Sequence, residues 1–227
     1  MRRRREPTGT DLLTWQAASL LLDYPDEGLL DRRPLLRRAV AGLPAATGGP
    51  LGRFLDHLDA TPLPELAADY VATFDHRKRC CLYLTYYVHG DTRKRGMALL
   101  RFKGVYTAAG LVLDDGELPD HLGVVLEFAA TGDPGEGRRL LGEHRAGLEL
   151  LRLALTEIAS PWTSVLEAVS ATLPSLSGRN HDAIARLIAE GPPEEEVGLA
   201  PFGVAAAGPV LLPDPVLVPG PTQGVGP

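Results

Sequence analysis

Apolar residues recur at steps of three and four along most of the chain, which is the spacing of one face of an α-helix. The most regular stripe predicts one long core-facing helix that stops before Pro161, and its members are Leu141, His144, Leu148, Leu151, Leu155 and Ile158. Shorter stripes predict further helices near residues 10–24, 26–43, 51–58, 62–74, 82–88, 91–109, 119–132, 162–173 and 184–188. No alternation of apolar and polar residues flanked by hairpin turns is convincing. The pattern therefore predicts an all-α fold, a single-domain helical bundle.

Several helix boundaries can be read from capping and helix-breaking residues. Thr10 and Asp11 are placed to cap the first helix, and Asp91 to cap the helix over 91–109. Pro34 is expected to interrupt the helix over 26–43. Pro119 suits the first turn of a helix that ends at Gly132.

The composition changes after about Gly191, where the sequence reads "GPPEEEVGLAPFGVAAAGPVLLPDPVLVPGPTQGVGP". Proline removes backbone donors and glycine raises the entropic cost of ordering, so this stretch is not expected to form a core of its own. We therefore predict a basic flexible N-terminus (1–9), a helical domain (10–190) and a Pro/Gly-rich C-terminal tail (191–227).

The bulk composition indicates a soluble globular protein, because 44% of the 227 residues are hydrophobic. The formal net charge of −6 argues against nucleic acid as a partner, which requires a basic footprint. The arginines of "MRRRREPTGTDLLTW" resemble an export signal, but Asp11 and Gln16 interrupt the apolar residues that follow and no small-residue cleavage site appears. No run approaches the ~20 apolar residues that a membrane span needs. We expect a cytoplasmic protein without direct membrane insertion.

The segment "FDHRKRCCLYLTYYVHGDTRKRG", residues 74–96, gathers the types of side chain that bind metals or act as nucleophiles. Adjacent cysteines such as Cys80 and Cys81 cannot form a normal chelating pair, and no second pair exists. They also lie too close for a disulfide, which suggests free thiols in a reducing compartment. We expect one buried and one partly exposed thiol, and no metal. A small helical thiol enzyme that uses Cys80 and Cys81 stays open as an alternative.

The same segment is rich in tyrosine, which points to a surface for holding another polypeptide. Tyr83, Tyr86 and Tyr87 would cluster on one side of a helix, and their hydroxyls suit a groove wall better than a closed core. Phe74, by contrast, is expected to pack in the core. Arg95 would need a carboxylate partner if it faces inward, and Asp120 and Glu127 are the candidates.

Three stretches together resemble a known family: "LLLDYPDE" (20–27), "YVATFDHRKRCCLYLTYYVHGDTRKRGMALLRFKGVYTAAG" (70–110) and "ELPDHLGVVLEFAA" (117–130). In this order they are similar to the nitrate reductase delta subunit, the NarJ-type molybdenum cofactor assembly chaperones. The resemblance covers about residues 10–190 and leaves out the tail. The proline-rich first motif of the trimethylamine-oxide and dimethyl-sulfoxide branches is missing here, which favours the nitrate reductase branch.

The resemblance implies an all-helical chaperone that is not an enzyme. Such proteins bind the N-terminal peptide of the apo nitrate reductase alpha subunit as an amphipathic helix and assist molybdenum cofactor insertion and complex assembly. No permanently bound cofactor is implied, and transient contact with molybdenum guanine dinucleotide is left open, as is the choice between a monomer and a weak dimer. A chaperone for a different molybdoenzyme and a general helical scaffold for protein interactions are two rival hypotheses.

The family motifs and the tyrosine cluster together give the residues predicted to bind the partner. These are Tyr70, Phe74, Tyr83, Tyr86, Tyr87, His89, Asp91, Arg95, Tyr106, Glu117, Pro119, Asp120, His121 and Glu127. No catalytic residue and no metal ligand is predicted.

Overall fold

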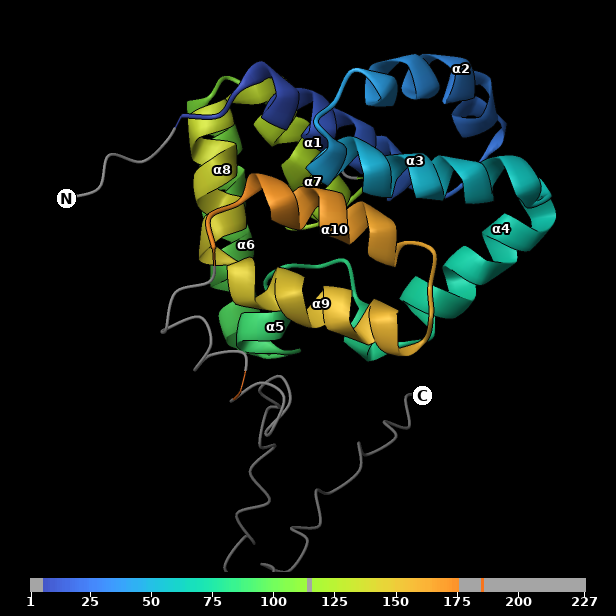
Figure 1. Cartoon of the computed structure of the whole chain (residues 1–227). Helices are drawn as coiled ribbons and strands as arrows, with labels where there is room; N and C mark the ends of the chain where they lie inside the picture. The colour runs from blue at the N-terminus through green and yellow to red at the C-terminus, as the bar shows by residue number, and fades with distance from the viewer. Residues whose placement is uncertain (1–5, 114–115, 176–184, 186–227) are drawn as a thin grey trace, which may run out of the picture. The chain divides into compact units, whose positions relative to one another are not determined.

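The computed structural model describes residues 6–113, 116–175 and 185, and its elements are helices (Figure 1). The α-helices are α1 (Gly9–Leu21), α2 (Glu27–Ala41), α3 (Ala45–Ala60), α4 (Leu63–Tyr70), α5 (Tyr86–His89), α6 (Arg93–Ala108), α7 (Leu122–Glu127), α8 (Pro134–Glu143), α9 (Arg145–Glu157) and α10 (Thr163–Thr172). Two π-helical turns, Val71–Asp75 and Phe128–Gly132, and a 3₁₀ turn, Lys78–Cys80, complete the series. The predicted all-α fold is confirmed. The predicted tail lies outside the described residues, as does the predicted helix over 184–188 apart from Ala185.

Helix α1 begins at Gly9 because Thr8, and not Thr10 or Asp11, is its N-cap. The Thr8 hydroxyl accepts a hydrogen bond from the Asp11 backbone N–H at 3.3 Å, and the Asp11 carboxylate accepts one from the Thr8 N–H at 2.9 Å. This reciprocal pair is a capping box, which satisfies two backbone donors at once. The predicted cap position was wrong, although Asp11 contributes from the first turn.

Helix α2 runs continuously through Pro34, so the predicted interruption was wrong. Proline lacks the N–H that would have bonded to the carbonyl of Leu30, four residues earlier. The Arg33 Nε donates to that Leu30 carbonyl at 3.1 Å instead. A neighbouring side chain thus supplies a donor to the acceptor that proline leaves free.

The helix predicted over 82–88 is largely replaced by an extended segment, and only Tyr86–His89 is helical. The extended part pairs with residues far along the chain: the Leu84 N–H donates to the Asp120 carbonyl at 3.0 Å, and the Leu122 N–H to the Leu82 carbonyl at 2.8 Å. An isolated antiparallel bridge joins Tyr83 and His121 between these two bonds. These long-range backbone bonds replace the local helical ones.

Two further boundaries differ from the sequence pattern. Asp91 does not cap α6, because the N-cap is Thr92, whose hydroxyl donates to the His89 carbonyl at 2.8 Å. Pro119 lies before α7 instead of in its first turn, since the helix begins at Leu122. The helical backbone does continue to Gly132, as predicted, through the π-helical turn.

The long helix predicted over 141–158 is divided at His144 into α8 and α9, which run in different directions (Figure 1). His144 has φ −98° and ψ 17°, outside the α-helical region. Its ring Nδ1 lies 2.9 Å from the carbonyl of Leu140, four residues earlier. The side chain and the backbone of His144 thus both bond to the last turn of α8, at the point where the chain changes direction.

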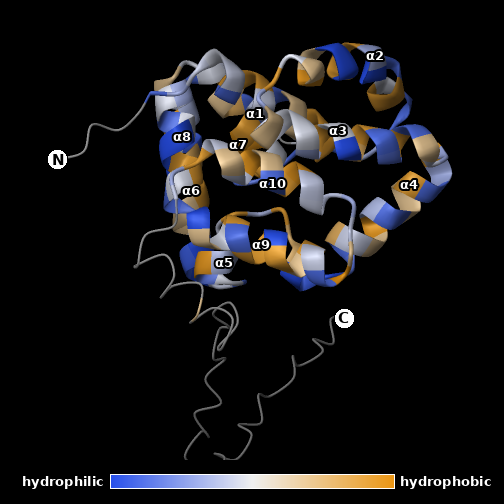
Figure 2. Cartoon of the chain, viewed as in Figure 1, coloured by the Kyte–Doolittle hydropathy of each residue, from blue (hydrophilic) through white to orange (hydrophobic). Residues whose placement is uncertain are grey.

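The hydrophobic core lies where α10 contacts α1, α3 and α9 (Figures 1 and 2). Trp15 and Trp162 are both buried here with Phe54. The indole N–H of Trp15 donates to the Thr172 hydroxyl at 2.8 Å, and that of Trp162 to the Leu21 carbonyl at 3.1 Å. Both hydrogen bonds join α1 to α10, and they satisfy the buried N–H groups. The Trp162 ring also packs against Phe54 of α3.

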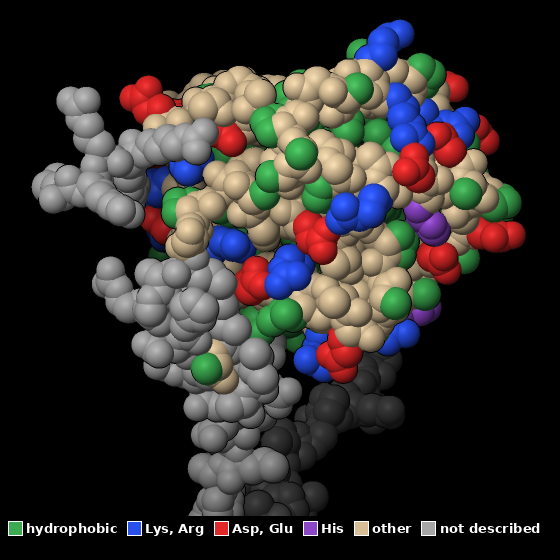
Figure 3. Space-filling model, in the orientation of Figure 1, with side chains coloured by type: hydrophobic (Ala, Val, Ile, Leu, Met, Phe, Trp, Pro, Cys, Tyr) green, Lys and Arg blue, Asp and Glu red, His purple; other side chains and the backbone are tan. Residues whose placement is uncertain are grey.

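Charged residues of both signs alternate over the face formed by α3, α9 and α10 (Figure 3). One pair on this face joins Arg53 of α3 to Glu167 of α10. Among the described residues, no helix combines the length and the apolar character required to span a bilayer.

Candidate partner-binding surface

Seven of the fourteen residues predicted to bind a partner are buried: Tyr70, Phe74, Tyr87, Tyr106, Pro119, Asp120 and His121. The buried tyrosines bond to carbonyl groups of the protein itself. Tyr70 donates to the Leu22 carbonyl at 3.0 Å and Tyr106 to the Pro119 carbonyl at 2.6 Å. Burial raises the pKa of both phenols. These two tyrosines therefore pack within the domain, and their predicted contact with a partner stays a prediction.

Tyr87 is the most enclosed of the tyrosines predicted to form the groove. Its hydroxyl donates to the carbonyls of Arg79 and Cys81, at 3.1 and 2.9 Å. Helix α9 approaches it so closely that a Cβ placed on Gly147 would lie 3.0 Å from the Tyr87 Cβ. Tyr87 thus fixes α5 and the 3₁₀ turn to α9. Its predicted contact with a partner stays a prediction.

A group of four polar residues, here called the polar anchor, holds the start of α6 to the rest of the domain. It consists of Thr85, Asp91, Arg95 and Asp120. The fully buried Asp120 carboxylate accepts hydrogen bonds from the Thr85 N–H and hydroxyl, at 3.0 and 2.5 Å. Arg95 Nε donates to the Thr85 hydroxyl at 3.2 Å, and its Nη2 lies 3.8 Å from Asp120. The predicted carboxylate partner of Arg95 is therefore Asp120, and not Glu127, which is exposed.

The half-buried Tyr83 and Glu117 and the buried His121 lie next to the polar anchor. The Tyr83 hydroxyl donates to Glu117 at 3.0 Å, and the Arg95 guanidinium lies 5.3 Å from the centre of the Tyr83 ring. Burial and the nearby carboxylate raise the pKa of Tyr83 to about 12. The ring of His121 meets the Tyr83 ring edge-on at 5.5 Å, and burial lowers the pKa of this imidazole.

The other predicted residues lie around the same region with some solvent exposure. Tyr86 is half-buried with its ring edge-on to Tyr87 at 5.9 Å, and His89 is half-buried at the end of α5. Asp91 is exposed and its carboxylate lies 3.4 Å from the Arg95 guanidinium. Tyr83, Tyr86, His89, Asp91 and Arg95 are therefore the predicted residues of this segment that a partner could reach from solvent.

The two thiols have the exposures predicted from the sequence, since Cys80 is buried and Cys81 partly exposed. Burial raises the pKa of Cys80, and it raises that of Cys81 to about 11. Thiols with raised pKa values are protonated at neutral pH and are poor nucleophiles. Across the described part of the chain, no three metal-ligating side chains converge.

Helix α6 exposes an apolar stripe that the sequence interpretation missed. Its members, here called the α6 outer stripe, are Met97, Leu100, Gly104 and Ala108. Met97 is 70% exposed and Leu100 60%. The spacing of 3, 4 and 4 residues places them on one face, opposite the buried Phe102 and Tyr106. This helix is therefore apolar on two opposite faces, and no described part of the chain covers its outer face.

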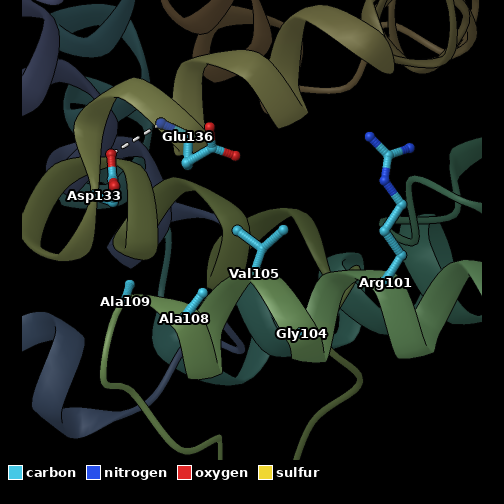
Figure 4. Close-up of a pocket in the computed structure, with 7 residues that line it drawn as sticks. All are labelled: Arg101, Gly104, Val105, Ala108, Ala109, Asp133 and Glu136. Atoms are coloured by element: carbon cyan, nitrogen blue, oxygen red, sulfur yellow. Dashed lines mark hydrogen bonds between the residues drawn. The ribbon is translucent and has the colours of Figure 1, made fainter.

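A hollow of 290 Å³ adjoins the α6 outer stripe, between α6 and the start of α8 (Figure 4). Its walls are Arg101, Gly104, Val105, Ala108, Ala109, Asp133 and Glu136. Asp133 caps α8, because its carboxylate accepts from the Glu136 N–H at 2.9 Å (Figure 4). An apolar floor with two carboxylates on one wall suits an apolar side chain beside a basic one.

An ion-pair network crosses the outer end of this hollow. Glu143 pairs with Arg101 of α6 and with Arg139 of α8, both at 2.7 Å, and Arg139 also pairs with Glu136. These contacts lower the pKa of Glu143 against the opposing effect of its partial burial. The network fixes α6 relative to α8 and thereby preserves the shape of the hollow.

The chain matches the family model described as nitrate reductase delta subunit over residues 41–167. The chain belongs to this family. The match includes the polar anchor and α6 with its outer stripe. The family resemblance that rested on the sequence motifs is thereby confirmed.

Curated relatives carry names that refer to nitrate reductase. The "Nitrate reductase-like protein NarX" of Mycobacterium tuberculosis is 44% identical over 160 residues, 70% of this chain and 24% of that protein. The "Probable nitrate reductase molybdenum cofactor assembly chaperone NarJ" of Bacillus subtilis is 30% identical over 168 residues, 74% of this chain and 91% of the relative. The Escherichia coli NarJ chaperone is 36% identical over 152 residues, 66% of this chain and 64% of the relative. This chain thus matches about a quarter of NarX but nearly all of the Bacillus protein.

Proposed function

We propose that this protein is an assembly chaperone of a respiratory nitrate reductase. It binds the apo catalytic subunit, assists insertion of the molybdenum cofactor as cargo, and then leaves the complex. Membership of the delta subunit family and the printed names of the NarJ relatives support this assignment. We further propose that the protein acts in the cytoplasm and has no catalytic activity of its own.

We place the client on the α6 outer stripe, where it would lie as an amphipathic helix. The observation that carries this placement is the pair of large apolar side chains, Met97 and Leu100, standing in solvent on a helix whose other face is already packed. Clustered exposed apolar side chains on a folded domain are typical of protein-binding sites. A helix that supplies apolar residues at three- and four-residue steps would cover them.

The predicted residues around Tyr83 and Asp91 keep a role in this proposal at one end of the stripe. The polar anchor fixes the start of α6 through Arg95, two residues before Met97, and the Tyr83 ring borders it. A client that extends past Met97 toward α5 would meet the exposed Asp91 carboxylate and the Val88 side chain. Direct contact of the buried residues with a client would require the domain to open.

A peptide titration tests this placement. Synthetic N-terminal peptides of nitrate reductase catalytic subunits encoded beside this chain are titrated into the full chain in a calorimeter. Leu100→Asp is expected to weaken binding by more than about tenfold, because a charge would have to be buried against the client. Leu35→Asp on α2 is the matched control, since Leu35 is also 60% exposed. Equal affinity of both variants would contradict the placement on α6.

The thiol-enzyme alternative makes an opposite prediction. If Cys80 and Cys81 were catalytic, replacing both with serine would abolish function. A chaperone should retain most of its client rescue, because the raised thiol pKa values indicate packing roles. A chaperone for another molybdoenzyme would bind a different set of peptides in the same calorimeter.

A further inference from the structure

The α6 outer stripe has its large and its small side chains at opposite ends. Met97 and Leu100 project from the first half, and Gly104 and Ala108 leave the second half open beside the 290 Å³ hollow. A Cβ placed on Gly104 would meet no atom within 4 Å, so this position is free to receive a side chain from another molecule.

This arrangement is self-complementary under a two-fold axis. If a second α6 lies antiparallel to the first with the axis at the level of Phe102, Leu100 of each copy faces Gly104 of the other. The same axis places Met97 opposite Ala108. The midpoint between residues 97 and 108 lies within about 1 Å of the midpoint between residues 100 and 104, because the helix rises about 1.5 Å per residue. Residues that face each other reciprocally in this way define an isologous interface.

Charge supports the same alignment. Lys94 lies on the flank of α6 that faces the hollow, two turns before Arg101, and makes no ion pair with any described residue. The axis carries Lys94 of one copy to the level of residue 110 of the other, next to the carboxylates of Asp133 and Glu136. Opposite charges therefore meet twice per pair of chains. Arg101, which lies nearer the axis, is held by Glu143 of its own chain at 2.7 Å.

We propose that two copies of this chain associate reversibly through the α6 outer stripe, antiparallel, and that the pair conceals the stripe until a client displaces one copy. The pairing itself rests on the geometry of α6 alone. The competition with the client rests on the proposed function as well. A chaperone that covers its own apolar surface in this way would expose it only when a better-fitting segment is present.

Sedimentation equilibrium of the full chain tests the pairing. The expected mass rises with concentration from the 24.3 kDa of one chain to twice that value. Leu100→Asp should weaken self-association by more than about tenfold, because two like charges would face the interface. Leu35→Asp should associate like the parent chain. A chain that stays monomeric at every concentration, or a Leu100→Asp variant that still pairs, would overturn the proposal.

A charge exchange tests the two-fold alignment directly. Lys94→Glu alone places glutamate against Glu136 twice, and Glu136→Lys alone places lysine against Lys94 twice, so each variant should pair less well than the parent chain. Mixing the two variants should restore association, because both contacts of the mixed pair then join opposite charges. Mixed chains that associate no better than either variant alone would refute the antiparallel alignment.

The same variants separate this proposal from the proposed function. Nitrate reductase peptides that shift the parent chain from pairs to single copies would support competition at one surface. Peptides that bind without dissociating the pair would refute the competition and leave the pairing intact. Loss of self-association in Leu100→Asp with full peptide affinity would instead place the client elsewhere.

Discussion

Helices α3 and α6 each contain 16 residues and each borders a hollow, yet they are used in opposite ways. Helix α3 buries Leu51, Phe54, Leu55 and Leu58 against α10 and α2. Its solvent side carries charges, and Asp56 and Asp59 pair with Arg37 of α2. Helix α6 buries only Phe102 and Tyr106 among the described side chains and exposes an apolar stripe.

Under the proposed function, the difference between the two helices separates stability from binding. On α3, the apolar face packs in the interior and the polar face meets water, so the helix contributes to stability. On α6, apolar side chains of the outer face are exposed to water. This exposure is unfavourable and does not stabilise the isolated chain. The polar anchor and the Arg101–Glu143–Arg139 network hold α6 in place in spite of its small buried face.

The largest contrast is expected from truncating apolar residues on the two helices. Phe54→Ala should lower the free energy of unfolding by about 3–5 kcal/mol, because it empties a site beside Trp162. Leu100→Ala should change it by less than about 0.5 kcal/mol, since the side chain lies in solvent. Urea unfolding followed by circular dichroism measures both. A comparable loss from Leu100→Ala would mean that α6 already packs on its outer face in the isolated chain.

A second contrast concerns the two carboxylates that contact Arg95. Asp120→Ala should cost about 1–3 kcal/mol, because the buried N–H and hydroxyl of Thr85 lose their acceptor. Asp91→Ala should cost less than about 1 kcal/mol, since its ion pair is exposed. Thermal unfolding of the two variants measures both losses of stability. A larger loss in Asp91→Ala than in Asp120→Ala would mean that the exposed ion pair, and not the buried carboxylate, holds the start of α6.

Solution pH should affect the stability of the folded protein through a buried histidine between α8 and α9. The His144 ring lies 5.2 Å from the Phe102 ring, and burial lowers its pKa in the folded state. The unfolded chain then binds a proton below about pH 6.5 that the folded chain does not, so stability should fall there by up to about 1.4 kcal/mol per pH unit. Above that pH both states are neutral and the effect disappears.

The measurement is urea unfolding between pH 7 and pH 5. His121, whose pKa burial also lowers, contributes to the same slope, so His144→Phe should reduce the slope without removing it. Burial lowers the pKa of His144, and Arg101 acts in the same direction. Burial outweighs the hydrogen bond to the Leu140 carbonyl and the carboxylates of Glu143 and Asp120, which act to raise this pKa. An unchanged slope in His144→Phe would mean that this imidazole is protonated in the folded protein.

A modest gain in stability is expected from filling the two hollows. Gly104 of α6 and Gly52 of α3 each line one, and a Cβ on either meets no atom within 4 Å. Leucine at either position should stabilise its helix by up to about 1 kcal/mol through propensity. Only Gly104→Leu should also weaken peptide binding and self-association, measured by calorimetry and sedimentation. If Gly104→Leu and Gly52→Leu changed peptide binding and self-association equally, α6 would not be the binding helix.

Sequence periodicity predicted the helices that bury a single apolar stripe, and α10 is an example. It placed Trp162, Val165, Leu166 and Val169 on one stripe, and all four are buried. Local patterns could not predict that Tyr83 lies in an extended segment, because the bonds that hold it come from Asp120 and Leu122, more than 35 residues later. They also gave Tyr87 to a groove wall, although the carbonyl groups of Arg79 and Cys81 satisfy its hydroxyl.

The α6 outer stripe was present in the sequence and was missed for a different reason. Apolar residues on α6 follow two stripes, one through Phe102 and Tyr106 and one through Met97 and Leu100. Periodicity finds both but does not say which one another helix covers. Choosing between them requires the tertiary structure, and the uncovered stripe is the one that points to function.

A helix with two apolar faces changes from a surface helix to an interior helix when another molecule covers its outer face. Met97, Leu100, Gly104 and Ala108 lie at the boundary of the isolated domain, but in any complex on this side they would become part of a continuous interior. Random substitutions there should pass a selection for folding and fail a selection for enzyme maturation. Libraries scored both ways would therefore disagree most along this one helix, and the disagreement would outline the occupied surface even while the occupant is unidentified.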